Sequence, residues 1–243
     1  MNSHELVTAA CPKIGGLGGA FYFVPDTLAS GKELGLDGFR FYVLGRGGVL
    51  GDAEAPVVAS AFGYWNGDLV AKLWNTARDK MAPRECGRAY IAASQAFGRA
   101  KFSEVANLGA FCAAAEKVVA AVDPAGLALF AGVASEPLAD DLPARAMQLT
   151  TVLREFRGSA HLLAVLASGL EPRIAHFLRR PEMMKTFGWP EEAPEVPAGA
   201  QEQLAAADKL TDALVLPAYS AVDGEGAAAM VSALAAMEAA VAS

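Results

Sequence analysis

The 243-residue sequence is poor in the side chains that build metal centres and disulfide frameworks. It has three cysteines and three histidines. No two cysteines form a Cys-x-x-Cys pair and no two histidines lie three or four residues apart, so we expect no bound metal and no cofactor. An odd number of widely spaced cysteines is typical of reduced thiols, and the sequence therefore predicts a cytoplasmic protein.

Long hydrophobic runs and a secretory leader are also missing. Glycine, proline or charged residues interrupt each apolar run before it reaches the roughly 18–20 residues that cross a bilayer. The opening stretch, MNSHELVTAACPKIGG, lacks a basic segment followed by an apolar one, so nothing in it resembles a signal peptide. We therefore expect no membrane partner.

Basic residues are outnumbered, because 20 Lys and Arg stand against 27 Asp and Glu and give a net charge of −7. Residues 182–243 have ten acidic and two basic side chains. Residues 142–243 have twelve acidic and eight basic side chains. Proteins that bind duplex DNA present a basic face, so this distribution disfavours nucleic acid as a partner. A short basic patch with Arg173, Arg179 and Arg180 keeps DNA binding open as an alternative.

Alanine-rich apolar stretches with helical spacing are abundant. In residues 103–122 apolar side chains recur at every third or fourth position, with Ser103 as a predicted N-cap and Asp123-Pro124 as a stop. Strand signals are weak, because FRFYVL and LVLPAY are ambiguous, and we expect at most a two-stranded wing. The sequence thus predicts an all-α, or nearly all-α, fold. The predicted helices cover residues 4–22, 36–45, 55–65, 67–80, 83–98, 103–122, 144–168, 171–180, 200–216 and 225–241.

Two proline-rich stretches interrupt the predicted helices. The first, ASEPLADDLP, predicts a boundary between a helical N-terminal half, residues 1–133, and a C-terminal half, residues 134–243. The second, GWPEEAPEVPAGA at residues 188–200, is typical of an exposed, extended connection. The length allows one elaborate domain or two small ones.

The segment LREFRGSAHLLAVLASGL, residues 153–170, places costly polar side chains at the head of a run that is otherwise apolar. On a helix, Arg154, Arg157 and His161 lie on one stripe beside a broad apolar face. Gly158 lies between them, and a glycine in mid-helix costs about 1 kcal/mol relative to alanine. We therefore expect another backbone or a ligand to approach it closely.

Two interpretations of this polar stripe stay open. In the functional interpretation, the stripe lines a cavity that binds an anionic or polar small molecule. In the structural interpretation, it forms ion pairs with a neighbouring helix through Asp140 or Asp141. Glu155 points to another side of the helix, so acid–base chemistry with His161 would need a bend or an adjacent helix that unites them.

Two glycine-rich stretches invite comparison with nucleotide-binding loops. KIGGLGGAF has Phe21 where the dinucleotide fingerprint needs its third glycine, which favours a packing helix. GRGGVLGD holds Arg46 but no Gly-Lys-Ser/Thr, so it is not a P-loop. Its glycines would let backbone amides approach an anion beside Arg46, or form a tight turn between helices.

The stretch FGYWNGD gathers aromatic side chains with hydrogen-bonding groups. Tyr64 and Trp65 would wall a pocket, and Asn66 or Tyr64 would orient a ligand. Core packing, with a helix break at Asn66, explains the same residues.

The stretch TVLREFRGSAHLLAVLASGL resembles an actinobacterial family of helix-turn-helix-like proteins without an assigned activity. LALFAGVASEPLADDLP before it, and FYFVPD and GFRFYVLGRGGVLGDAEAPVVASAFGYWNGDLV further upstream, are similar to other marks of that family. The likeness covers about residues 20–170. It implies a helical N-terminal half joined to a winged-helix-related C-terminal half.

In that family an Arg-Glu-His-Arg-Gly-Asp-Gly-His run stands at this place. Phe156 occupies the position of its first histidine, and Ser159-Ala160 occupy that of Asp-Gly. The resemblance therefore implies no metal or acid–base role for those positions. The matching residues are Arg154, Glu155, Arg157, Gly158 and His161.

These observations predict a small-molecule-binding protein with a polar pocket between its two helical halves. A DNA-binding helix-turn-helix regulator is one alternative. A metal-independent enzyme of specialised metabolism that uses Arg157, His161 and Glu155 is another. The identity of the ligand and the oligomeric state stay open. The predicted ligand-binding residues are Arg154, Arg157, His161, Glu155, Arg46, Tyr64, Trp65 and Asn66.

Overall fold

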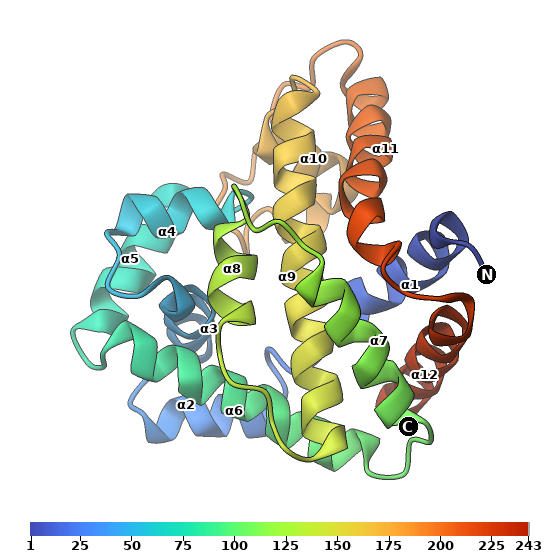
Figure 1. The fold of residues 1–243 in the computed structure, drawn as a ribbon. Coiled ribbons are helices and arrows are strands. Elements are labelled where there is room, and N and C mark those ends of the chain that lie inside the picture. Colours follow the sequence, from blue (N-terminus) through green and yellow to red (C-terminus); the bar gives the residue numbers. More distant parts are fainter. Residues whose placement is uncertain (243) are drawn as a thin grey trace.

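The computed structural model describes residues 1–242, which fold into α-helices and short 3-10 helices without a β-strand. The prediction of an all-α fold is confirmed. The two-stranded wing is not found in this part of the chain, so the winged-helix character of the C-terminal half is not confirmed. Figure 1 shows that the longest helix, α9 (Leu142–Ala167), runs through the middle of the molecule with the other helices around it.

The chain before α9 forms a series of helices, of which some pack directly on α9 and the others lie to one side of it (Figure 1). They are α1 (Ser3–Leu17), α2 (Pro25–Glu33), α3 (Gly38–Gly47), η1 (Gly48–Leu50), α4 (Ala55–Phe62), α5 (Gly67–Arg78), α6 (Pro83–Phe102), α7 (Leu108–Ala120) and α8 (Ala128–Ala134).

The chain after α9 forms a short helical segment and then two long helices. They are α10 (Pro172–Arg179), η2 (Pro181–Met183), α11 (Ala200–Tyr219) and α12 (Gly224–Ala242). Between η2 and α11, residues 190–199 are exposed except for Pro194, which is half-buried, as expected of the proline-rich connection. The division into domains at residue 134 stays a prediction.

Each predicted helix corresponds to an observed one, but some boundaries differ. Ser103 does not cap a helix N-terminus; it follows the last residue of α6. α7 begins at Leu108, after Asn107, whose φ of 61° lies in the left-handed region. The ambiguous segments FRFYVL and LVLPAY belong to α3 and α11. The sequence did not predict α2 and α8.

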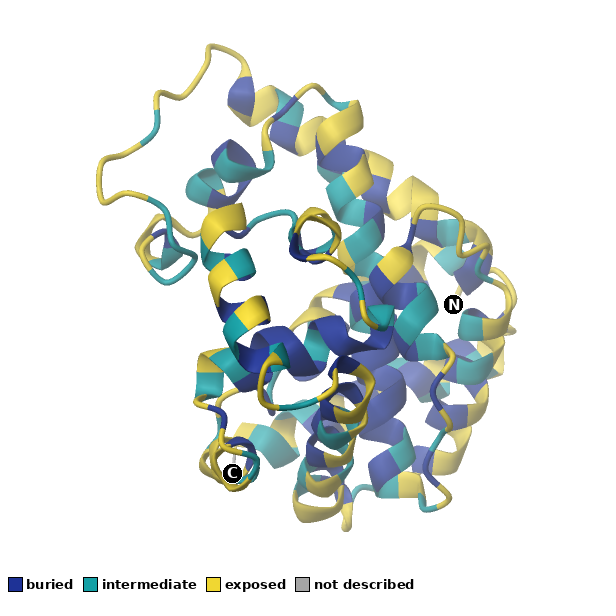
Figure 2. Ribbon diagram, turned by 90° about the vertical axis from the view of Figure 1, so that its left-hand side faces the viewer, coloured by how far each residue is buried: buried dark blue, intermediate teal, exposed yellow. Residues whose placement is uncertain are grey.

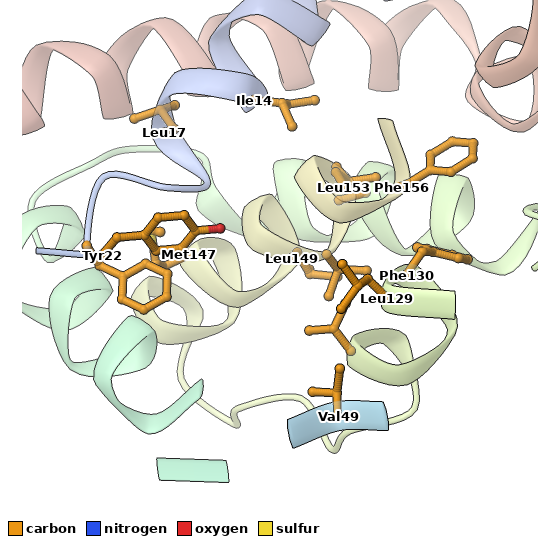
Figure 3. Packing of buried hydrophobic residues seen from close by; sticks show 14 of the residues in the cluster. Ile14, Leu17, Tyr22, Val49, Leu129, Phe130, Met147, Leu149, Leu153 and Phe156 are labelled. Carbon is orange, nitrogen blue, oxygen red and sulfur yellow. The ribbon is translucent and has the colours of Figure 1, made fainter. Parts of the chain in front are cut away.

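The core is built on α9, which packs against α1, α6, α7, α8, α10 and α11. Figure 2 shows the buried residues concentrated in the interior and the exposed ones on the loops and outer helix faces. Figure 3 shows apolar side chains from several elements meeting around α9. They include Ile14 and Leu17 of α1, Val49 of η1, Leu129 and Phe130 of α8, and Leu149, Leu153 and Phe156 of α9.

Among the described residues, α12 is long and apolar enough to cross a bilayer by length and composition, which corrects the expectation that no segment is. One such helix is weak support for a membrane span, because core helices pass the same test. In this structure α12 packs against α1 and α7, and Met230, Leu234 and Met237 are buried in the core.

Candidate functional site

Glu155 is the centre of a buried ion-pair network between α3 and α9. Arg46 donates from Nε and Nη2 to its two carboxylate oxygens, at 2.8 and 2.7 Å. Arg154 Nη1 and the Tyr22 hydroxyl donate to Oε1 at 3.2 and 3.3 Å. Burial raises the pKa of Glu155, but the charge and hydrogen bonds of Arg46 outweigh burial, so this pKa lies below its usual value. Glu155 is therefore held ionised and links α3 to α9. Its contact with Arg154 places its carboxylate beside the polar stripe, whereas the sequence predicted that it points to another side of the helix.

Arg46 lies in the last turn of α3, which corrects the prediction of a glycine-rich loop. The glycines beside it allow close packing against α6. A Cβ atom on Gly48 would lie 2.0 Å from the carbonyl oxygen of Pro83, and one on Gly45 would lie 2.6 Å from Cβ of Tyr90. The glycines therefore make room for a neighbouring helix and do not form a cradle of backbone amides.

His161 contacts α11 through its Nδ1, which lies 2.9 Å from Oγ1 of Thr211. The Thr211 hydroxyl donates its only proton to the carbonyl oxygen of Ala207 at 2.7 Å, so Nδ1–H of His161 must be the donor to it. Burial, with the positive charges of Arg179 and Arg157, lowers the pKa of His161 to about 4. The ring is therefore neutral at pH 7, and Nε2 is left as a hydrogen-bond acceptor.

Arg157 also reaches toward α11, where its Nη2 donates to Oδ1 of Asp212 at 3.5 Å. Its Nε is buried without a hydrogen-bond partner. The expected pairing with Asp140 or Asp141 does not occur among the described ion pairs. Asp141 instead caps α9 by accepting from the backbone of Ala144, and pairs with Arg99 at 2.7 Å.

A cleft of about 600 Å³ opens beside the stripe, lined by residues of α1, α3, α4, α8, α9 and α10. Its volume lies within the range of small-molecule sites. No carboxylate side chain from residues 1–242 lines it. The arginines that line it are Arg46, Arg154, Arg157, Arg179 and Arg180.

Aromatic and imidazole rings form another part of the cleft wall. Trp65 stacks on Phe187 with ring centroids 4.4 Å apart, and Tyr64 lies nearly parallel to His161 at 6.2 Å. The Tyr64 hydroxyl and Nε2 of His176 are buried without a hydrogen-bond partner. Polar groups in such surroundings are costly unless something pairs with them.

The structure brings most of the predicted site residues together. Six of them line the cleft, and Glu155 lies behind it in the ion-pair network. Asn66 does not line the cleft; its Oδ1 caps α5 by accepting from the backbone of Asp68 at 2.9 Å. Glu155 and His161 have different hydrogen-bond partners, so they form no acid–base pair with each other. The six lining residues are Arg46, Tyr64, Trp65, Arg154, Arg157 and His161.

The contribution of α10 and of the segment after it was not predicted from the sequence. His176, Arg179 and Phe187 line the cleft, yet no periodicity indicates that this part of the chain returns to the α4–α5 turn. The apolar-and-basic pattern of α10 was the only local signal. Within residues 1–242 no group of three or more His, Cys, Asp or Glu side chains is placed to hold a metal ion.

In three pairs of consecutive helices in the described chain, the four-residue turn between them holds a glycine with a positive φ. The pairs are α2–α3, α4–α5 and α9–α10, and the glycines are Gly35 (φ 75°), Gly63 (φ 64°) and Gly169 (φ 73°). Two helices joined by a short turn with glycine are typical of the helix-turn-helix motif.

A helix-turn-helix family matches residues 9–243, nearly the whole chain. The chain belongs to this helix-turn-helix family. No curated protein and no solved structure matches it. The narrower resemblance, to an actinobacterial family without an assigned activity, stays a prediction.

Membership of the helix-turn-helix family corrects the expectation that nucleic acid is not a partner, because such a family suggests nucleic-acid binding. That expectation rested on net charge, which is dominated by the acidic residues 182–243. A DNA-binding surface needs only a local excess of positive charge. Membership also suggests a soluble protein of the cytoplasm, in agreement with the sequence.

Proposed function

We propose that the protein binds double-stranded DNA through the α4–α5 helix-turn-helix, with α5 in the major groove. The observation that carries this proposal is the free outer face of α5. Lys72 and Asn75 are exposed there, three residues apart on one stripe that begins at Asp68 and ends at Asp79, both also exposed. The helices α3 and α4 support the opposite face. The buried residues of that face are Val70, Leu73, Trp74 and Ala77.

The exposed side chains of α5 suit contacts with DNA. A lysine donates to phosphates or to guanine, and an asparagine reads adenine through two hydrogen bonds in the major groove. Lys72 has no ion-pair partner among the described residues. From Lys72 to Lys101 the chain has seven basic and two acidic residues, in contrast to its overall net charge of −7. Arg78, Arg84, Arg88 and Arg99 of this stretch pair with carboxylates outside it, so its local positive charge comes from Lys72, Lys80 and Lys101, which have no carboxylate partner among the described residues.

The other two helix-turn-helix units suit DNA less well. α3 is buried over residues 41–45, so it has no face for a groove. α10 is short, and its arginines are engaged, since Arg179 pairs with Asp208 and the guanidinium of Arg173 lies 5.1 Å from the Trp189 ring. Of the basic patch indicated by the sequence, Arg180 alone thus lacks a carboxylate or ring partner among the described residues.

Fluorescence anisotropy with labelled DNA duplexes tests the proposal. We expect binding at about 50 mM salt that weakens at least about tenfold by about 200 mM, because phosphate contacts release counterions. Lys72→Ala should weaken binding to all sequences and reduce the salt slope by about one. Asn75→Ala should cost about 1–3 kcal/mol on duplexes selected for tight binding and less on random ones.

Arg180→Ala is the matched control, because it removes one exposed positive charge just after the end of α10. We expect it to leave DNA affinity nearly unchanged. If it abolishes binding while Lys72→Ala does not, α10 is the reading helix and the assignment to α5 is wrong. If the unmodified protein binds no duplex from a random pool at about 50 mM salt, the DNA-binding proposal itself is wrong.

A further inference from the structure

We infer that the cleft between α1, α3, α4, α9 and α10 binds a small organic anion with a planar apolar body, that is, an aromatic carboxylate, sulfonate or phosphate. This site goes beyond the proposed DNA binding and does not depend on it. Charge, open space and unpaired polar atoms each support it independently.

Positive charge exceeds negative charge around the cleft. Five arginines line it, and three nearby carboxylates pair with them. Glu155 is shared by Arg46 and Arg154, and no carboxylate among the described residues pairs with Arg180. Two positive charges thus lack a carboxylate, which favours an anion in the space between them.

Glycine keeps part of the cleft wall open. Gly158 lies in the middle of α9, where glycine is destabilising relative to alanine, and it lines the cleft. Close helix packing does not explain it, because no heavy atom lies within 4 Å of a Cβ atom built there. The same is true of Gly15 and Gly16 on α1, which also line the cleft. The expected approach of another backbone to Gly158 is therefore absent, and the space is left for a ligand.

Several polar groups around this space lack a hydrogen-bond partner. Nε of Arg157, Nε2 of His176 and the hydroxyl of Tyr64 are buried and unpaired. Neutral His161 adds an acceptor at Nε2, since its Nδ1–H is donated to Thr211. A bound molecule with an oxyanion and a hydroxyl or amino group would pair with groups of both kinds, whereas a purely apolar one would not.

The apolar part of the wall is aromatic, which selects the shape of the ligand. Tyr42, Phe62, Trp65 and Phe187 line the cleft. The guanidinium of Arg46 already lies 4.5 Å from the centre of the Phe62 ring. Aromatic faces and guanidinium planes stack on flat rings, so a planar body fits this wall better than a branched aliphatic one.

A fluorescence titration of the full chain with the dye anilinonaphthalenesulfonate tests the inference, with the uncharged phenylnaphthylamine as its neutral counterpart. We expect about one dye per chain, and affinity for the sulfonate at least about tenfold higher than for the neutral dye, because only the sulfonate meets the arginines. Gly158→Leu should abolish binding of both dyes by filling the cleft. Gly158→Ala, its control, should reduce the affinity no more than about threefold.

Arg157→Gln separates recognition of charge from the filling of space. It should lower the affinity for the sulfonate about tenfold and leave the affinity for phenylnaphthylamine unchanged. If Gly158→Leu loses its near-ultraviolet circular dichroism, and so its tertiary packing, Arg157→Gln still tests the inference. Equal binding of the two dyes, or sulfonate binding unaffected by Arg157→Gln and by a folded Gly158→Leu, would overturn the inference. The titration contains no DNA, so its failure leaves the α5 proposal untouched.

Discussion

Arg46 of α3 and Glu155 of α9 form a bidentate ion pair, at 2.8 and 2.7 Å, between positions 109 residues apart in the sequence. Glu155 is 3% exposed, so the pair replaces solvent for a carboxylate that lies inside the protein. It also fixes the guanidinium of Arg46 at the edge of the cleft. The same contact therefore serves the packing of two helices and the shape of the candidate site.

Removal of Arg46 tests the stabilising role of this pair. Arg46→Met leaves a buried carboxylate with Arg154 as its remaining cation, and we expect a loss of about 3 kcal/mol in the free energy of unfolding. Urea denaturation at pH 7 measures it. The double variant Arg46→Met, Glu155→Gln should recover part of the loss, because no unpaired charge remains. A loss below about 1 kcal/mol in the single variant would show that the pair contributes little.

The titration of His161 predicts how stability changes with pH. Its pKa is lowered from 6.5 to about 4 in the folded chain, so the unfolded chain binds more protons between these values. Stability should therefore fall as the pH falls from about 6.5 to about 4, and His161→Gln should remove part of that fall. The pKa of His176 is also lowered by burial, so His176→Gln is expected to act in the same direction.

Proton NMR of the imidazole rings measures the pKa of His161 directly. Because the charge of Arg179 contributes to the lowered pKa of His161, Arg179→Gln should raise it. A His161 ring that titrates near 6.5 in the folded protein would contradict its burial beside two arginines.

Phe156 should be an anchor of the core. Its ring is 3% exposed and lies 5.3 Å from the ring of Phe130 on α8. Phe156→Ala is expected to cost about 3–5 kcal/mol in the free energy of unfolding, measured in urea. Leu166→Ala on the same helix is the control, because Leu166 is 55% exposed and its truncation should change stability by less than about 1 kcal/mol.

Substitution of two glycines by alanine should change the stability of the fold in opposite directions. Gly158→Ala is expected to stabilise the fold by about 0.5–1 kcal/mol, because a methyl group there meets nothing. Gly18→Ala should destabilise it, because the new Cβ would lie 2.6 Å from Cβ of Arg154 and 2.8 Å from the carbonyl oxygen of Thr150. Thermal or urea denaturation of both variants measures the contrast. A destabilising Gly158→Ala would mean that the space beside it is already filled.

Helical periodicity predicted most helices because their apolar faces repeat over several turns. It did not predict α8 (Ala128–Ala134), whose sequence ALFAGVA is too short and too uniformly apolar to show a period. Short helices depend on tertiary packing, and α8 packs on α9. The start of α7 was predicted wrongly because the left-handed conformation of Asn107 leaves no pattern in the neighbouring apolar residues.

The candidate site was predictable only in separate pieces, since Arg46 and the pair Tyr64 and Trp65 were singled out from their own stretches and also line the cleft. The spacing of Arg154, Arg157 and His161 indicated one polar stripe, and all three line the cleft. Their partners could not be predicted, because periodicity within α9 carries no information about which distant segment lies beside it. Glu155 was predicted to point elsewhere, yet long side chains reach around the helix, and its Oε1 accepts from Arg154 at 3.2 Å.

The length of α9 has a consequence for how this chain tolerates change. Its 26 residues form one continuous helix. Some of its side chains pack in the core against several helices, and its arginines line the cleft. One residue inserted before Arg154 would rotate the rest of α9 by about 100° about the helix axis. The helix would be preserved, but the guanidinium groups would then face the apolar core. Insertions and deletions are therefore expected to be confined to segments such as residues 190–199, where an added residue shifts nothing else.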